Sequence, residues 1–159
     1  MDEVRTAAEP LYVAVIGEGE AGPQALADAE AVGRLLAARG AVVVCGGMGG
    51  VMDAAARGAR AAGGVSIGIL PGTRREEGSP ALTYRLPTGL GHARNPLVVL
   101  AADAVIAIGG RAGTLTEIGY ALIYRKPVIG LRTWTLARPE VGPGPLVEAV
   151  PTAETAVER

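Results

Sequence analysis

The chain has 159 residues, of which 49% are hydrophobic and 19% charged, and its net charge at pH 7 is −1. This composition indicates a globular domain, and the near-neutral charge gives no electrostatic case for binding nucleic acid or a membrane surface. No apolar run reaches the roughly 18 residues of a membrane span, and the polar residues 1–10 do not resemble a signal peptide. We therefore expect a cytoplasmic protein with a flexible segment over 1–10 and a single domain over 11–159, whose last part, 132–159, is the least clearly patterned.

Short apolar segments rich in β-branched residues alternate with alanine-rich segments along the chain. They predict strands at 11–17, 41–47, 65–72, 81–89, 104–110 and 127–131, and helices at 23–40, 51–64, 95–104 and 113–126. The segment 81–89 is less apolar, which suits an edge strand, and Asn95 is expected to cap the third helix. Strands this apolar are covered by helices on both faces, so the sequence predicts a single doubly wound, Rossmann-like α/β fold with a mostly parallel sheet. Such a sheet binds ligands at the carboxyl ends of its strands.

The first glycine-rich strand end is GEGEAG, residues 17–22, which formally matches the dinucleotide fingerprint G-x-G-x-x-G. That fingerprint also needs an acidic residue at the end of the second strand, where this chain has Cys45, Gly46 and Gly47. Glu18 and Glu20 would further place negative charge beside a pyrophosphate. A dinucleotide dehydrogenase is therefore a weak hypothesis, although Gly17 stays a candidate for close contact with a ligand.

The second glycine-rich strand end is GGMGG, residues 46–50, which leads directly into a helix. A tight turn between strand and helix needs one glycine, whereas four favour a backbone laid against a ligand. The positive end of the helix and its free N–H groups would then bind an anion.

The third is GGRAGTLTEIG, residues 109–119, where Gly113 and Thr114 open a helix. Backbone N–H groups there, together with the Thr114 hydroxyl, can hold a phosphate. Glu117 is explained either as a first-turn carboxylate that favours the helix dipole or as a ligand-binding group. Because an ionised Glu only accepts hydrogen bonds, a sugar hydroxyl is its natural partner, and the segment suits a phosphorylated sugar or nucleotide.

The loop GHARNP, residues 91–96, adds an arginine to this set. Arg94 can donate two hydrogen bonds to a phosphate or to Glu117, or it is an ordinary solvated arginine. His92 is the single histidine, and without Cys or His neighbours it is a poor metal ligand, so we expect it at a loop or at the edge of the ligand site.

The segments GGMGGVMDAAARGA, GHARN and GGRAGTLTEIGYAL together resemble the LOG (Lonely Guy) family, long labelled as lysine decarboxylases, over residues 11–131. The resemblance implies a Rossmann-like fold, a dimer, and cleavage of nucleoside 5′-monophosphates to free base and ribose 5-phosphate. Arg94 matches the arginine of the family's Arg-Lys pair, and Gly110, Gly113, Thr114 and Glu117 match its P-G-G-x-G-T-x-x-E motif. Decarboxylation is not expected, because the single lysine, Lys126, precedes a proline at the start of a strand.

Three departures point to a sister branch of that family. Asn95 replaces the lysine of the pair, Gly109 the proline, and Arg111 the second glycine of the motif. The result resembles the branch of molybdenum cofactor carrier proteins, which are proposed to hold a phosphorylated pterin or nucleotide without cleaving it. Arg111 would add positive potential at the phosphate site and favour a more highly charged ligand.

Two hypotheses follow, a carrier of a phosphorylated, nucleotide-like molecule and, as the alternative, a phosphoribohydrolase in which Arg94 and Glu117 are catalytic. The expected ligand is a nucleotide or a molybdenum cofactor, and we expect no other cofactor or metal to be required. We also expect the protein to form a homo-oligomer. The candidate binding residues are Gly17, Gly46, Gly47, Met48, Gly49, Asn95, Gly109, Gly110, Arg111, Gly113 and Thr114.

Overall fold

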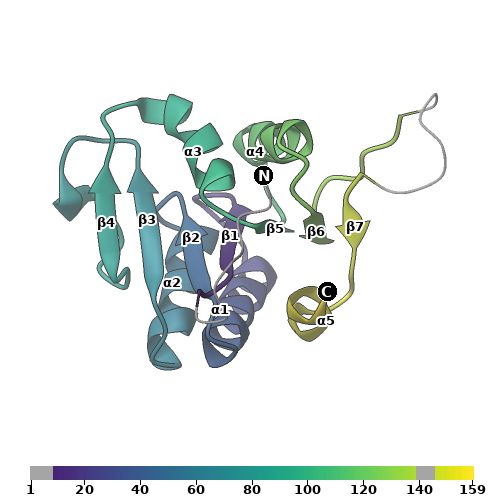
Figure 1. Cartoon of the computed structure of the whole chain (residues 1–159), viewed down its shortest axis with the longest axis horizontal. Helices are drawn as coiled ribbons and strands as arrows, with labels where there is room; N and C mark the ends of the chain where they lie inside the picture. Colours follow the sequence, from purple (N-terminus) through teal and green to yellow (C-terminus); the bar gives the residue numbers. More distant parts are fainter. Residues whose placement is uncertain (1–8, 139–145) are drawn as a thin grey trace.

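The computed structural model describes residues 9–138 and 146–159, which form one seven-stranded sheet with helices on both faces (Figure 1). The strands are β1 (Tyr12–Gly17), β2 (Val42–Cys45), β3 (Ser66–Leu70), β4 (Tyr84–Pro87), β5 (Ala104–Ile108), β6 (Val128–Leu131) and β7 (Glu148–Ala149). The α-helices are α1 (Pro23–Ala38), α2 (Val51–Ala61), α3 (Asn95–Leu100), α4 (Ala112–Ile123) and α5 (Ala153–Glu158), with 3-10 turns η1 (Arg75–Glu77) and η2 (Gly91–Arg94). The predicted doubly wound α/β fold is confirmed. The expected flexible segment 1–10 falls almost wholly outside the described residues.

The strand order is β4-β3-β2-β1-β5-β6-β7, and every neighbouring pair is parallel. The chain builds outward from β1 to β4 and then returns to place β5 on the other side of β1. The central position of β1 is evident at Ala14, which pairs with Val44 of β2 and Val105 of β5. The direction of winding switches between β1 and β5, and sheets of this type bind ligands at the carboxyl ends of the strands near that point.

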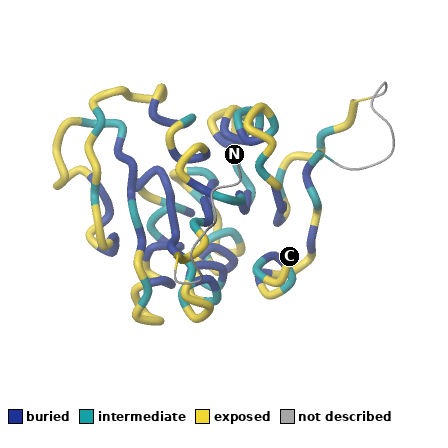
Figure 2. Tube along the Cα trace, viewed as in Figure 1, coloured by how far each residue is buried: buried dark blue, intermediate teal, exposed yellow. Residues whose placement is uncertain are grey.

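The side chains of each strand alternate between two core layers. Val13 and Val15 of β1 pack with α1, α2 and α5, whereas Ala14 and Ile16 pack with α3 and α4. Figure 2 shows the resulting buried strands, with exposed residues at the loops and at the edge strand β4. The longest helix, α1, has 16 residues. Within the described residues, no helix is both long and apolar enough to cross a bilayer.

The ends of most helices follow their sequence signals, with one exception. Helix α1 begins at Pro23, and Gly40 just beyond its end has a φ of +74°. Thr152 caps α5 by accepting a hydrogen bond from the Thr155 N–H. The prediction that Asn95 caps α3 is wrong. The turn η2 runs directly into α3, and the Asn95 side chain accepts a hydrogen bond from Arg94 instead.

Candidate functional site

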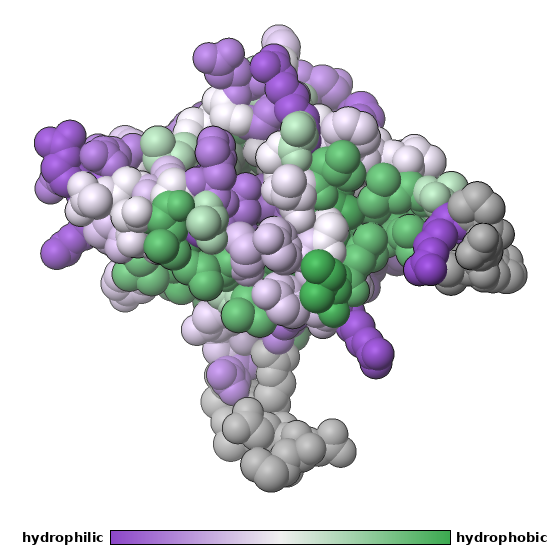
Figure 3. Space-filling view, turned by 90° about the horizontal axis from the view of Figure 1, so that it is seen from above, coloured by the Kyte–Doolittle hydropathy of each residue, from purple (hydrophilic) through white to green (hydrophobic). Residues whose placement is uncertain are grey.

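A cavity of about 510 Å³ opens at the carboxyl end of β1, beside the start of α4. It therefore lies at the switch point of the sheet, where Rossmann-like folds bind ligands. Seen from above, onto this end of the strands, the surface mixes polar and apolar side chains, and several of the most hydrophilic ones lie at its upper and left edges (Figure 3). The lining residues are Ile16, Gly17, Glu18, Gly19, Glu20, Gly46, Met48, Met52, Pro71, Gly91, His92, Arg94, Asn95, Arg111, Gly113, Thr114 and Glu117.

The start of α4 presents free hydrogen-bond donors to this cavity. Helix α4 begins at Ala112 with Arg111 as its N-cap, and no side chain caps it. Among the described residues, none accepts a hydrogen bond from the backbone N–H groups of residues 110–114, and of these residues Arg111, Gly113 and Thr114 line the cavity. Unpaired N–H groups at the positive end of a twelve-residue helix form a ready anion site.

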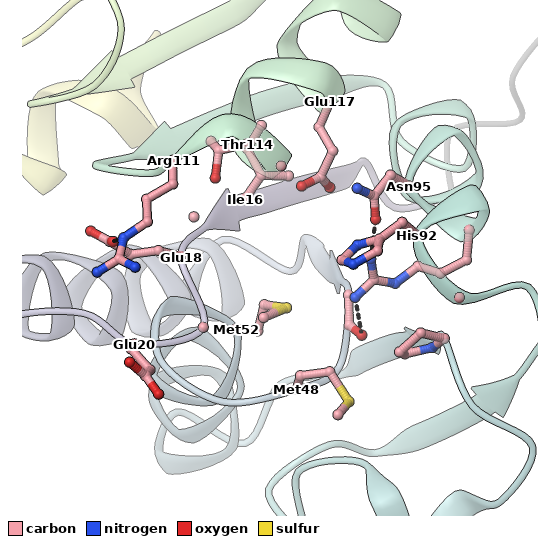
Figure 4. A pocket seen from close by; sticks show the side chains of 17 residues that line it. Ile16, Glu18, Glu20, Met48, Met52, His92, Asn95, Arg111, Thr114 and Glu117 are labelled. Atoms are coloured by element: carbon pink, nitrogen blue, oxygen red, sulfur yellow. Dashed lines mark hydrogen bonds and ion pairs between the residues drawn. The ribbon is translucent and has the colours of Figure 1, made fainter.

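Thr114 adds a side-chain donor at the same place. The residue is only 3% exposed, yet no described residue forms a hydrogen bond with its hydroxyl, which lines the cavity (Figure 4). A Cβ on Gly110, which has a φ of +105°, would lie 2.5 Å from the Thr114 side chain. Glycine at position 110 therefore allows the loop to fold tightly over Thr114 and leaves the hydroxyl facing the cavity.

Two residues after β6 hold this loop from behind. The Thr133 hydroxyl donates to the Gly109 carbonyl oxygen, and Trp134 Nε1 donates to the Arg111 carbonyl oxygen at 3.2 Å. Because these contacts use the carbonyl groups of the loop, its N–H groups are left for a ligand. Trp134, for which the sequence predicts no role, therefore helps to hold the loop that forms the site.

Glu117 is a buried carboxyl group without a hydrogen bond among the described residues. It is 8% exposed and points into the cavity beside Asn95 (Figure 4). As the sixth residue of α4 it lies beyond the first turn, so the explanation as a first-turn carboxylate is wrong. Burial raises the pKa of Glu117 to about 7, and the positive charge of Arg94 opposes that rise. At neutral pH the group is therefore able both to accept and to donate a proton.

Arg94 is also buried, at 8% exposure, but its guanidinium is largely engaged by the protein. Nε donates to the Ile69 carbonyl oxygen at 2.9 Å, Nη2 to the Gly46 carbonyl oxygen at 3.2 Å, and Nη1 to Asn95 Oδ1. Burial lowers its pKa, and the Glu117 carboxylate opposes that shift. No direct hydrogen bond joins Arg94 to Glu117, so the residue ties together the ends of β2 and β3 while facing the ligand cavity.

The GGMGG segment has explanations within the protein itself. A Cβ on Gly46 would lie 2.5 Å from Arg94 Nη2, and one on Gly50, with a φ of +62°, would lie 2.2 Å from the Glu18 carbonyl oxygen. That same carbonyl accepts the first N–H of α2, from Val51, at 3.1 Å. Asp53 already places a carboxylate in the first turn of α2. The sequence predicts an anion site at the start of both helices, and the N–H groups at the start of α2 are already more engaged within the protein than those at the start of α4.

Arg111 does not contribute an isolated positive charge. Its Nε lies 3.0 Å from Glu18 Oε2, and the pair spans the edge of the cavity (Figure 4). Glu18 also lines a neighbouring cavity of about 320 Å³ at the start of α1. The expectation that Arg111 simply raises the positive potential is therefore corrected, because Glu18 offsets its charge.

The structure brings most of the sequence-derived candidates together, but not all. Gly17, Gly46, Met48, Arg94, Asn95, Arg111, Gly113, Thr114 and Glu117 line the main cavity, and the exposed His92 also lines it; Gly47, Gly49, Gly109 and Gly110 do not. Sequence reasoning missed Ile16, Met52 and Pro71, which carry no polar signal. Within the described ranges, no three His, Cys, Asp or Glu side chains are grouped to hold a metal ion.

Comparison with known families accounts for this arrangement. The model of the SLOG cluster4 family matches residues 10–153. The chain belongs to the SLOG cluster4 family. A protein of Archaeoglobus fulgidus described as uncharacterised is 40% identical over 122 residues, which cover 77% of this chain and 80% of that protein.

Solved structures similar to this SLOG cluster4 chain include two proteins named for the molybdenum cofactor. The molybdenum cofactor binding protein of Rippkaea orientalis has a TM-score of 0.85 and 38% identity, with 96% of each chain covered. The molybdenum cofactor carrier protein of Chlamydomonas reinhardtii has a TM-score of 0.80 and 31% identity, with 94% of this chain and 95% of that chain covered. The predicted place in a LOG-like Rossmann family, near the branch of molybdenum cofactor carriers, is confirmed.

Proposed function

We propose that the protein binds a phosphorylated heteroaromatic small molecule, either a molybdenum-cofactor-type pterin or a nucleotide, and carries it without cleaving it. The observation that supports this most strongly is the start of α4. The backbone N–H groups of Arg111, Gly113 and Thr114 and the buried Thr114 hydroxyl line the cavity and have no acceptor among the described residues, so they can donate to a phosphate.

The opposite side of the cavity suits a flat ring system. Met48, Met52 and Pro71 line it with apolar atoms, and Met52 lies near the middle of the cavity in Figure 4. Thioether groups make favourable contacts with aromatic rings and adapt to their outline. A ligand with its phosphate at Thr114 and its ring against the methionines would thus use both ends of the cavity, and a phosphorylated pterin satisfies both.

The resident groups also favour a carrier over an enzyme. In this account Arg94 binds three protein oxygen atoms and so positions the ends of β2 and β3, which limits what it offers to a reacting ribose. A molybdenum cofactor fits the donor set through its phosphate alone, because the donors identified at the cavity are N–H and O–H groups suited to an anion.

A phosphoribohydrolase is the second candidate, and Glu117 favours it. A buried carboxyl group with a pKa of about 7, next to a phosphate site, is suited to general acid–base catalysis at a glycosidic bond. In that reaction Glu117 would activate water as the bond between base and ribose breaks, leaving free base and ribose 5-phosphate.

One experiment separates the two candidates. The protein is titrated calorimetrically with a panel of nucleoside 5′-monophosphates and with molybdenum cofactor released from a molybdoenzyme, while free base and ribose 5-phosphate are assayed. Glu117→Gln is tested beside Glu154→Gln, which changes an exposed carboxylate on α5 in the same way. We expect binding without base release. Base release that vanishes in Glu117→Gln alone would establish the hydrolase instead, and failure to bind any phosphorylated ligand would contradict both.

We also propose that copies of the chain associate through α3 and α4. These neighbouring helices expose Leu97, Leu100, Ile123 and Tyr124, and Ile123 is 69% exposed. Large exposed apolar side chains on neighbouring helices are a common feature of protein interfaces.

A further inference from the structure

The ion pair between Glu18 and Arg111 stands at the edge of the phosphate site and has no part in the proposed function so far. Arg111 is the N-cap residue of α4, directly before the N–H groups that face the cavity. The Arg111 side chain is 77% exposed, whereas the Glu18 side chain is only 22% exposed. Within this ion pair the Glu18 carboxylate is therefore the more fixed group, and the Arg111 side chain is the one free to reorient toward a ligand.

The Glu18 carboxylate lies close to the loop that would hold the phosphate. Oε2 is 3.0 Å from Arg111 Nε, and Oε1 lies 3.5 Å from the position that a Cβ on Gly109 would occupy. The Glu18 backbone is held as well, because its carbonyl oxygen accepts the Val51 N–H. A negative charge is therefore held beside the anion site, independently of where Arg111 points.

Glu20 adds a second negative charge on the same side. It lines the cavity and is exposed, and no described residue forms an ion pair with it. Met48, Met52 and Pro71 add apolar atoms to the lining, and Met52 lies between these carboxylates and Met48 in Figure 4. A phosphate seated on the free N–H groups therefore has Glu18 and Glu20 near it on one side, with the apolar atoms beyond them available to a ring. Each further phosphate group in a chain would bring about one more negative charge toward these carboxylates.

We propose that Glu18 is a specificity-determining residue that restricts the site to ligands with a single phosphate. It does so by neutralising Arg111 and by repelling additional phosphate groups. This inference rests on the proposed phosphate site at the start of α4. It reverses the expectation that Arg111 selects a more highly charged ligand, since that expectation considered the arginine without its partner.

The test uses anions that need no ring: inorganic phosphate, pyrophosphate and tripolyphosphate. Each is titrated into the ¹⁵N-labelled protein at low ionic strength, where charge effects are least screened, and the amide signals of Gly113 and Thr114 report occupancy of this site alone. The variants are Glu18→Gln and the double variant Glu18→Gln with Arg111→Ala, and Glu154→Gln is the control for loss of a remote carboxylate.

In the unmodified protein we expect phosphate to bind at least as tightly as tripolyphosphate, although most cationic sites prefer the more highly charged anion. Glu18→Gln should improve the ratio of tripolyphosphate to phosphate affinity by about tenfold, because a repulsive charge is lost and Arg111 is released. The double variant should lose part of that gain, and Glu154→Gln should show none. An unchanged ratio in Glu18→Gln, with binding still reported by Gly113 and Thr114, would overturn the inference while leaving the proposed function intact. No movement of these signals with any anion would overturn the proposed phosphate site itself and the inference with it.

Discussion

Glu117 and Arg94 face the same cavity and attract each other electrostatically, yet no hydrogen bond joins them. Arg94 donates to Asn95, Gly46 and Ile69 instead, and Glu117 is left with its carboxyl group directed into the cavity. Opposite charges held near each other but separately positioned leave the carboxyl group available to a ligand. This arrangement determines how the protein should respond to pH.

The free energy of unfolding should depend on pH through Glu117. Burial raises its folded-state pKa from the usual 4.5 to about 7, so the folded protein retains a proton that the unfolded chain has lost. Below about pH 4.5 the carboxyl group is protonated in both states and costs no stability. As pH rises to about 7, the free energy of unfolding falls, by roughly 3 kcal/mol at most. Urea unfolding of Glu117→Gln between pH 4.5 and 8.5 should therefore show a growing stability advantage over the unmodified protein. A plot of unfolding free energy against pH for Glu154→Gln should run parallel to that of the unmodified protein. If the plot for Glu117→Gln is also parallel, the raised pKa of Glu117 is refuted.

Gly46→Ala should destabilise the fold by about 1–3 kcal/mol. The added methyl group would lie 2.5 Å from Arg94 Nη2 and 2.8 Å from Met52 Sδ, and the guanidinium would have to leave the Gly46 carbonyl oxygen. Gly119→Ala is the matched control, because nothing lies within 4 Å of its Cβ position in α4. That control should stabilise the protein by roughly 0.5–1 kcal/mol through helix propensity. Equal thermal unfolding of the two variants would contradict the packing of Arg94 against Gly46.

The sequence predicted which strand ends come together, because the carboxyl ends of parallel strands meet at one edge of a sheet. Once alternating strands and helices were recognised, Gly17 and the residues after β5 had to lie near each other. Thr114 and Glu117 then follow from helical spacing. The family resemblance contributed the roles considered for Arg94 and Glu117, which spacing alone does not give.

Side-chain contacts between distant parts of the chain could not be predicted from the sequence. Gly46 looked like a ligand-binding glycine, but its missing side chain makes room for Arg94, 48 positions away. Arg111 looked like a free charge, but its partner Glu18 lies 93 positions earlier. Met52 and Pro71 gave no signal at all, since an apolar residue in a cavity has the same pattern as one in the core.

Trp134 should report ligand binding by its fluorescence. It is the single tryptophan of the chain, it is 38% exposed, and its indole N–H donates to the Arg111 carbonyl oxygen. A phosphate bound next to this carbonyl changes the electric field at the indole, so the emission should shift in proportion to calorimetric occupancy. Trp134→Phe should weaken binding a few-fold, because one hydrogen bond that holds the loop is lost. Calorimetric binding with constant emission would contradict the link between Trp134 and the site.

Self-association should depend on the apolar surface of α3 and α4. Ile123→Asp places a charge on its most exposed apolar residue and should reduce the mass measured by light scattering to that of the 16.0 kDa chain. Leu11→Asp is the comparison, because Leu11 is also an exposed apolar residue, at 55%, but lines a pocket with Ala156 and Val157 of α5. An unmodified protein that is already monomeric would contradict the proposed assembly.

The most direct test of the proposed binding site is a calorimetric titration of Thr114→Val with the tightest phosphorylated ligand of the panel. Valine keeps the shape of threonine and removes only the hydroxyl. Thr116→Val is the control, because the exposed Thr116 hydroxyl donates to the Gly113 carbonyl oxygen and not into the cavity. We expect Thr114→Val to weaken binding about tenfold or more, as for a lost hydrogen bond to a charged group, and Thr116→Val to bind like the unmodified protein. Unchanged affinity in Thr114→Val would contradict a phosphate site at the start of α4.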